Sequence, residues 1–230
     1  MKIRLLVVVL LAVLAAVVVL RAQRTSDYRD PDTTYEEGWT ALFNGKDLTG
    51  WVPVLEAGEG KSRRYREQEV GEQSTFFVKD GRIMTTGTPN GYIRTADVYD
   101  NFVFHVEVKF SQMGNSGVLV HVQSDAVWPK AIECQLYQSH MGRIFPIMGA
   151  TLEGGEMIHA ASKPAGEWNV YEVYSEDGRV ATVLNGVIVG LGSNADPRTG
   201  HIALQSEGVP AEFRNVKIKR YTPAWRMRGK

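Results

Sequence analysis

Hydrophobic and polar residues alternate with a period of two along most of the chain that follows residue 39. The clearest run is 102–110 (FVFHVEVKF), in which every second residue is a large apolar one and His105, Glu107 and Lys109 stand between them. Because successive side chains of a strand point to opposite faces, this run predicts a strand with one face on a core and the other in solvent. Similar runs occupy residues 40–43, 76–79, 82–86, 117–123, 131–137, 168–174, 180–184, 187–191, 201–205 and 212–219.

Short turn signals separate several of these runs. Asp80-Gly81 and Asn185-Gly186 each lie between two alternating segments, where both residues tolerate positive φ, and such pairs are typical of two-residue hairpins. No segment has the sustained 3.6-residue period of an amphipathic helix. Many short strands joined by tight turns predict an all-β fold, a two-sheet antiparallel sandwich.

Two segments lack the alternation. Residues 55–75 contain few apolar residues and many charged ones, which predicts a surface excursion. Residues 139–167 contain five glycines and two prolines, and we expect a long ordered loop that folds over a rim of the sandwich.

The N-terminus has the pattern of a targeting segment. Residues 1–23 contain two early basic residues and an apolar run of 16 residues from Leu5 to Leu20. This length lies between a signal-peptide core and a comfortable membrane span, so a cleaved signal and an uncleaved anchor both remain open. Either predicts an exported, periplasmic or extracellular domain, which contacts a membrane only through this segment if it is uncleaved. Residues 24–38 are expected to be a polar linker, 39–221 the sandwich and 222–230 a tail.

Composition narrows the class of partner. The chain has 26 basic and 26 acidic residues, a balance that argues against a nucleic-acid partner. Its one cysteine, Cys134, cannot form an internal disulfide, so a hydrophobic core must hold the exported domain together, with Cys134 as a buried thiol.

A set of polar residues on two of the predicted strands indicates a binding face. Alternation places His121 and Gln123 on one side of run 117–123, and Glu133, Gln135 and Tyr137 on one side of run 131–137. If the two runs are neighbours, these side chains share a surface suited to a polyhydroxylated ligand. The alternative is that they form the solvated side of an antiparallel sheet.

Aromatic and loop residues complete the predicted binding face. Trp128 or Tyr137 would stack on a sugar ring, and His140, like His159, lies in the segment expected to cover the cleft.

Several fragments, in order, resemble the 3-keto-disaccharide hydrolase domain family. They are 42–51 (LFNGKDLTGW), 114–118 (GNSGV), 168–169 (WN), 184–186 (LNG), 200–205 (GHIALQ) and 213–216 (FRNV), and the resemblance runs from about residue 39 to residue 221. It implies a concanavalin A-like jelly roll that acts on 3-keto-disaccharides or 3-keto-glycosides. In such substrates a base removes the acidified C2 proton and the C1 oxygen is expelled, with β-elimination or net hydrolysis as the outcome.

The resemblance also implies roles for individual residues. The family's Glu-x-Gln pair falls on Glu133 and Gln135, and either Glu133 or His121 would be the base. Gln135, Asn115 or a bound divalent metal would polarise the ketone.

Asn115-Ser116-Gly117 leads into a strand and would bring backbone close to the substrate. The chain departs from the family at Glu207, where many members have a histidine. A non-catalytic lectin-like module on the same fold, or a structural surface domain, is the alternative.

Overall fold

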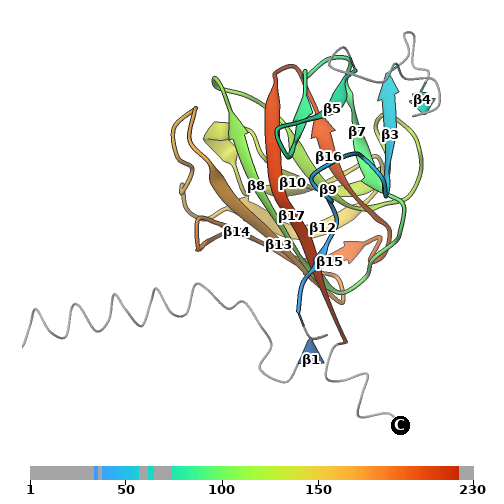
Figure 1. Cartoon of the computed structure of the whole chain (residues 1–230). Helices are drawn as coiled ribbons and strands as arrows, with labels where there is room; N and C mark the ends of the chain where they lie inside the picture. Colours follow the sequence, from blue (N-terminus) through green and yellow to red (C-terminus); the bar gives the residue numbers. More distant parts are fainter. Residues whose placement is uncertain (1–33, 36–37, 57–61, 65–73, 223–230) are drawn as a thin grey trace, which may run out of the picture.

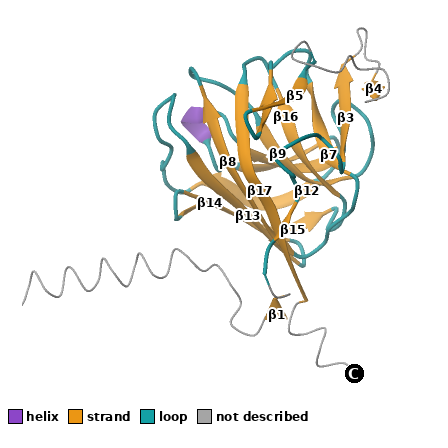
Figure 2. Ribbon diagram, viewed as in Figure 1, coloured by secondary structure: helices purple, strands orange, loops and turns teal. Residues whose placement is uncertain are grey.

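Two antiparallel β-sheets packed face to face form the described part of the protein (Figures 1 and 2). The structure is a computed structural model that describes residues 34–35, 38–56, 62–64 and 74–222. The predicted targeting segment, most of the linker, the tail and most of the 55–75 excursion lie outside these residues. No helix in the described part is long and apolar enough to cross a membrane.

The larger sheet has ten strands. Its order is β12 (Thr151–Met157), β15 (Val187–Asp196), β14 (Arg179–Leu184), β13 (Asn169–Glu176), β8 (Phe102–Phe110), β17 (Ala211–Thr222), β6 (Arg82–Thr85) and β5 (Phe76–Lys79), and β1 (Thr34–Tyr35) and β2 (Thr40–Ala41) also pair with β17. The C-terminal strand β17 therefore lies inside the sheet, between β8 and β6 (Figure 1).

The smaller sheet has seven strands. Its order is β11 (Ile144–Ile147), β10 (Ala131–Gln135), β9 (Gly117–Val122), β16 (His201–Ser206), β7 (Gly91–Thr95), β3 (Trp51–Glu56) and β4 (Ser62–Arg64). A single turn of 3₁₀ helix, Gln138–His140, follows β10.

The core between the sheets is the one that the alternation predicts. Phe104 of β8, Val118 and Val120 of β9, and Ile132 of β10 are fully buried in one apolar cluster. Each such side chain contributes about 1.5–3 kcal/mol through loss of contact with water. Cys134 is buried in the same cluster, as predicted.

The predicted hairpin turns are confirmed. Asp80 and Gly81 join β5 to β6, and Asn185 and Gly186 join β14 to β15, all with φ between 50° and 80°. These are the two-residue turns that match the twist of antiparallel strands.

The prediction of a long loop at residues 139–167 is wrong. Most of this segment is strand: β11 pairs with β10 at the edge of one sheet, and β12 pairs with β15 at the edge of the other. The prediction was wrong because glycines within β12, at Gly154 and Gly155, have positive φ and interrupt the alternation while the strand continues past a change of register.

Candidate functional site

The outer face of the seven-stranded sheet, turned away from the core, carries the candidate chemistry. On β10 the side chains of Ile132 and Cys134 enter the core, so Glu133 between them faces outward. Its direct neighbours across the sheet are Leu119 of β9 and Phe145 of β11. Glu133 is nevertheless only 5% exposed, so its carboxyl lies in a recess of this face.

Side chains from the two strands that flank β9 meet over Gly117. A Cβ atom at this position would lie 3.0 Å from Oε1 of Glu133 and 2.9 Å from Oε1 of Gln205. Glu133 comes from β10 and Gln205 from β16, on either side of β9, so both side chains reach over the same glycine. The absence of a side chain at Gly117 leaves the space that these two oxygen atoms occupy.

A second carboxyl lies on the same face. Glu207 follows β16 directly, and its backbone forms an isolated antiparallel β-bridge with Asn115, which precedes β9. The buried hydroxyl of Ser206 accepts a hydrogen bond from Thr85 of the other sheet, so the Ser206 side chain faces the core. Because side chains alternate along a strand, those of Gln205 and Glu207 face the outer side. Asn115, Gly117, Glu133, Gln205 and Glu207 thus form one cluster, here called the carboxyl cluster.

The electrostatics of the carboxyl cluster favour a bound proton. Burial, with a further contribution from the negative charge of Glu207, raises the pKa of Glu133 to about 8. Burial also raises the pKa of Glu207 above its usual value. No described residue donates a hydrogen bond to Glu133, and Oε1 of Gln205 and Oδ1 of Asn115 are buried without a partner in the described part.

A carboxyl with a pKa of about 8 is mainly protonated at neutral pH. Glu133, predicted from the sequence as a base, is therefore a proton donor under these conditions and becomes a base only as the pH approaches 8. Buried acceptors without partners are suited to the hydroxyl groups of a ligand.

A hollow of about 340 Å³ lies beside the carboxyl cluster. It is lined by Gln135, Tyr137, His140, Arg143 and Phe145. The rings of Tyr137 and His140 are stacked 5.9 Å apart at 7° to one another. Tyr137 and His140 thus lie near Glu133, and their rings line the hollow.

Gln135, predicted as a substrate ligand, has a local role as well. Its Oε1 accepts hydrogen bonds from the backbone N–H groups of Leu136 and Tyr137 at 3.0 Å each. Only its amide nitrogen therefore remains to face the hollow.

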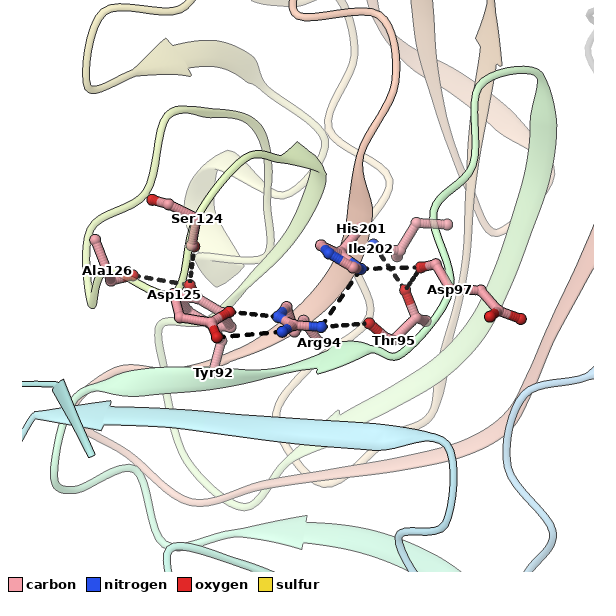
Figure 3. Close-up of polar contacts among 9 residues, drawn as sticks. All are labelled: Tyr92, Arg94, Thr95, Asp97, Ser124, Asp125, Ala126, His201 and Ile202. Carbon is pink, nitrogen blue, oxygen red and sulfur yellow. Dashed lines mark hydrogen bonds and ion pairs between the residues drawn. The ribbon is translucent and has the colours of Figure 1, made fainter. Parts of the chain in front are cut away.

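The loop that joins β9 to β10, residues 123–130, is fixed to the outer face by polar contacts (Figure 3). Arg94 of β7 binds Asp125 through two hydrogen bonds, Nε to Oδ1 at 2.6 Å and Nη2 to Oδ2 at 3.2 Å. The hydroxyl of Tyr92 lies 2.9 and 2.8 Å from the carbonyl oxygens of Ser124 and Ala126. This loop carries Trp128, which is 41% exposed and available to stack on a ligand.

His121 points to the opposite side of the sheet from the one that the alternation predicts. Its φ is 58°, and between β16 and β9 the register shifts by one residue at this point, which defines a bulge. The bulge turns the imidazole inward, where it is fully buried between the sheets, 5.8 Å from the ring of Phe102. His121 therefore does not share a face with Glu133.

The buried imidazole of His121 has a structural partner. Its Nε2 donates to Oγ of Ser175 at 2.9 Å, and Ser175 in turn donates to the carbonyl oxygen of Asp100. Burial lowers the pKa of His121 to about 4, so the ring is neutral at physiological pH.

Two further predicted substrate ligands are engaged in backbone contacts. Oγ of the buried Ser116 donates to the carbonyl oxygen of Gln205 at 2.8 Å and points away from the outer face. The amide of Gln123 donates to the carbonyl oxygens of His121 and Thr199, which fixes the bulge. Asn115, by contrast, lies in the carboxyl cluster.

Gln205 is not among the site residues predicted from the sequence, and Glu207 was noted there only as a departure from the family. Alternation in run 201–205 places Gln205 opposite the apolar Leu204, a usable signal. That both residues meet Glu133 depends on the pairing of β16 with β9, which no local pattern reveals.

A second hollow and a metal site are two alternatives to the carboxyl cluster, and each fits proton transfer to or from a ligand less well. A larger hollow of about 410 Å³ is lined by residues of β2, β7 and β17 and of the loops beside them, with Asp97 and Arg220 as its charged members, and it contains no carboxyl pair. No group of three or more His, Cys, Asp or Glu side chains in the described part is arranged to hold a metal ion, so we derive no step through a metal.

Comparison with known proteins gives a consistent assignment. The family model described as the 3-keto-alpha-glucoside-1,2-lyase-like domain matches residues 38–219. A search of curated proteins finds no significant match.

Solved structures share the fold. A provisionally named glycosyl hydrolase from Parabacteroides distasonis is 27% identical, with 80% of this chain and 94% of that chain covered and a TM-score of 0.61. A second such protein from the same organism is 21% identical, with 79% and 98% covered and a TM-score of 0.57. The β-porphyranase BpGH16B from Bacteroides plebeius is 11% identical, with 90% and 98% covered and a TM-score of 0.52, which shows the jelly-roll fold alone.

Proposed function

The chain belongs to the 3-keto-alpha-glucoside-1,2-lyase-like family, and from this premise we propose that it is a carbohydrate-active enzyme that cleaves 3-keto-glycosides. The cleavage proceeds by removal of the C2 proton and expulsion of the C1 oxygen. A ketone at C3 acidifies the C2 proton, so a carboxyl group has sufficient basicity for this step. The observation that carries the proposal is the recessed Glu133, with a pKa of about 8, beside a second carboxyl.

The neighbouring amides support the same chemistry. Removal of the C2 proton places negative charge on the ketone oxygen, and a hydrogen-bond donor that already points at this oxygen lowers the barrier. The amides of Gln205 and Asn115 lie in the carboxyl cluster, and each has an oxygen atom without a partner in the described part. Such amides can rotate to offer N–H to the ketone and C=O to a sugar hydroxyl.

The hollow beside the cluster provides a place for the sugar. Its volume is in the range of small-molecule sites, and it combines the stacked Tyr137 and His140 rings with the aromatic ring of Phe145. The leaving group, a second sugar or another alcohol, would lie along the outer face of the sheet. The protein takes these substrates outside the cytoplasm if residues 1–23 direct export, as the sequence predicts.

The direct test is turnover of methyl 3-keto-α-glucoside, whose alcohol leaving group needs a proton, followed as release of methanol. Glu133→Gln keeps the shape of the side chain and removes the carboxyl group that gives or takes a proton, so we expect a loss of about 100-fold or more. Glu153→Gln, an exposed carboxyl of β12 in the other sheet, is the matched control and should retain full turnover. Equal rates in the two variants would rule out a role for the recessed carboxyl.

A glycan-binding module is the second candidate. The stacked ring pair and the unpartnered acceptors would also bind an unmodified sugar without chemistry. Binding of a 3-keto-glucoside without release of its leaving group, unchanged in Glu133→Gln, would favour this function.

A further inference from the structure

Glu207 is a second carboxyl whose position has a consequence for the mechanism. Cleavage of a 3-keto-glycoside needs two proton transfers: one group takes the C2 proton and another gives a proton to the leaving O1. A Glu133 that starts the turnover protonated can give its proton to O1 but cannot also take the proton from C2, so a second group must act as the base. The structure places Glu207 on the same face of the same sheet, next to Asn115 and one alternation step beyond Gln205.

The two carboxyls differ in their exposure. Glu133 is 5% exposed and lies under its neighbours on β9 and β11, whereas Glu207 is only partly buried at the end of β16. Of two adjacent carboxyls that cannot both ionise easily, the more buried one retains the proton. A base that removes a proton from carbon must be ionised beforehand, and a donor to O1 must be protonated.

We propose that Glu207 is the base that removes the C2 proton and that Glu133 is the acid that protonates O1. This assignment rests on the proposed function. Glu207 takes the proton from C2, the electrons of the C2–H bond form the C1=C2 double bond, the C1–O1 bond breaks, and O1 receives the proton of Glu133. The products are a 2-hydroxy-enone derived from the sugar and a free alcohol. Return of one proton from Glu207 to Glu133, directly or through water, restores the starting state.

The other titratable groups near the pair lie at the adjacent hollow. Across the sheet Glu133 faces Leu119 and Phe145, and the side chain of Gln205 reaches over Gly117 beside it. Tyr137, His140 and Arg143 lie at the adjacent hollow, and Arg143 is paired with Glu156 at 3.0 Å.

The experiment separates the two proton transfers. The first readout is exchange of the C2 hydrogen of methyl 3-keto-α-glucoside in D₂O, which reports the base whether or not the C1–O1 bond breaks. The second is release of the leaving group from this substrate and from 4-nitrophenyl 3-keto-α-glucoside. The nitrophenolate leaves without protonation and so does not need an acid.

Each variant has its own expected pattern. In Glu133→Gln, release of methanol should fall about 100-fold or more, release of nitrophenol less than about tenfold, and C2 exchange should persist. In Glu207→Gln, C2 exchange and both releases should fall about 100-fold or more, and Glu207→His should recover at least part of the exchange. Thermal unfolding of each variant verifies that it is folded, and Glu153→Gln serves as the control.

Three results would overturn the assignment. Loss of exchange in Glu133→Gln with normal exchange in Glu207→Gln would reverse the roles. An active wild-type protein whose Glu207→Gln variant keeps full exchange and release would remove Glu207 from the reaction and leave the proposed function intact. A folded wild-type protein that neither exchanges nor cleaves would contradict the proposed function itself.

Discussion

At the scale of single residues, the main determinant of the candidate site is the cost of burying ionisable groups. Glu133 and His121 are both inside or nearly inside the protein, and burial shifts their pKa values in opposite directions, to about 8 and about 4. Both groups are therefore mainly neutral at neutral pH. His121 has a fixed hydrogen-bond partner in Ser175, whereas no described residue hydrogen-bonds to the Glu133 carboxyl. This contrast supports the proposal that Glu133 acts on a ligand.

Burial of Glu133 makes the stability of the protein depend on pH. Its pKa rises from about 4.5 in the unfolded chain to about 8 in the folded one, so the folded state prefers the protonated form. The stabilisation is complete below about pH 4.5 and is lost as the pH rises towards 8, by an amount on the order of a few kcal/mol. Glu133→Gln does not titrate, so we expect the variant to gain stability over the wild type between pH 5 and pH 8. Urea unfolding at both pH values measures this difference, and a constant difference would contradict it.

At the scale of elements, the site depends on how three adjacent strands share one glycine. The neighbours of Gly117, on β10 and β16, extend their side chains over it because it has none. The loop between β9 and β10 is fixed by a second device, the ion pair of Arg94 with Asp125, whose side chains are 14% and 16% exposed. One device shapes the carboxyl cluster and the other positions the loop that carries Trp128.

Gly117→Ala tests the first device. The added methyl would lie about 3 Å from the oxygen atoms of Glu133 and Gln205, both at the ends of flexible side chains. We expect these side chains to move aside at a cost of about 1 kcal/mol in stability, while turnover falls about tenfold or more through misplacement of the carboxyl. Parallel measurements of melting temperature and turnover check this expectation, and normal turnover would mean that the position of the carboxyl is not critical.

Asp125→Asn tests the second device. The change leaves the guanidinium of Arg94 without its charged partner, and we expect a loss of about 2 kcal/mol, below the ~3–5 kcal/mol of a fully buried pair. A double-mutant cycle with Arg94→Met isolates the interaction. Asp196→Asn, which breaks the exposed Lys130–Asp196 pair, is the control and should cost less than about 1 kcal/mol. Equal costs for the two pairs would show that the loop is not held by Arg94.

At the scale of the whole molecule, the described residues form one sandwich with a shared core. The strand β17, near the C-terminus, pairs with β8, β6, β1 and β2, so residues far apart in the chain are joined in the middle of one sheet. The core lies between the two sheets and is built from residues of both. We therefore expect this unit to fold without the apolar run near the N-terminus.

Deletion of residues 1–23 should accordingly give a soluble, monomeric β-sheet domain. The deleted run of 16 apolar residues has no period-two pattern with which to join the sandwich, and a polar segment separates it from residue 39. Size-exclusion chromatography and circular dichroism measure the outcome. Aggregation of the shortened protein, reversed when the run is restored in detergent, would contradict the prediction. N-terminal sequencing of the exported protein distinguishes a cleaved signal from an anchor.

The sequence by itself determined the class of fold, the core of the longest strand and the hairpin turns. These features depend on local chemistry: the alternation in run 102–110 assigns its own inner face, and Asn185-Gly186 makes its turn wherever the sheet lies. The outward direction of Glu133 follows from alternation in the same way. The family resemblance, carried by short fragments in a fixed order, is confirmed by the match over residues 38–219.

Only the tertiary structure decided which polar residues meet. A single extra residue in β9 reverses the side of the sheet to which His121 points, and nothing in the local pattern announces such a bulge. The strands within residues 139–167 form because β10 and β15 offer them edges to pair with, since their own alternation is weak. Glu207 and Gln205 reach Glu133 through the pairing of β16 with β9, and the burial that raises the pKa of Glu133 arises from that same assembly. Long-range strand pairing, which no local sequence period encodes, therefore determines the composition of the site.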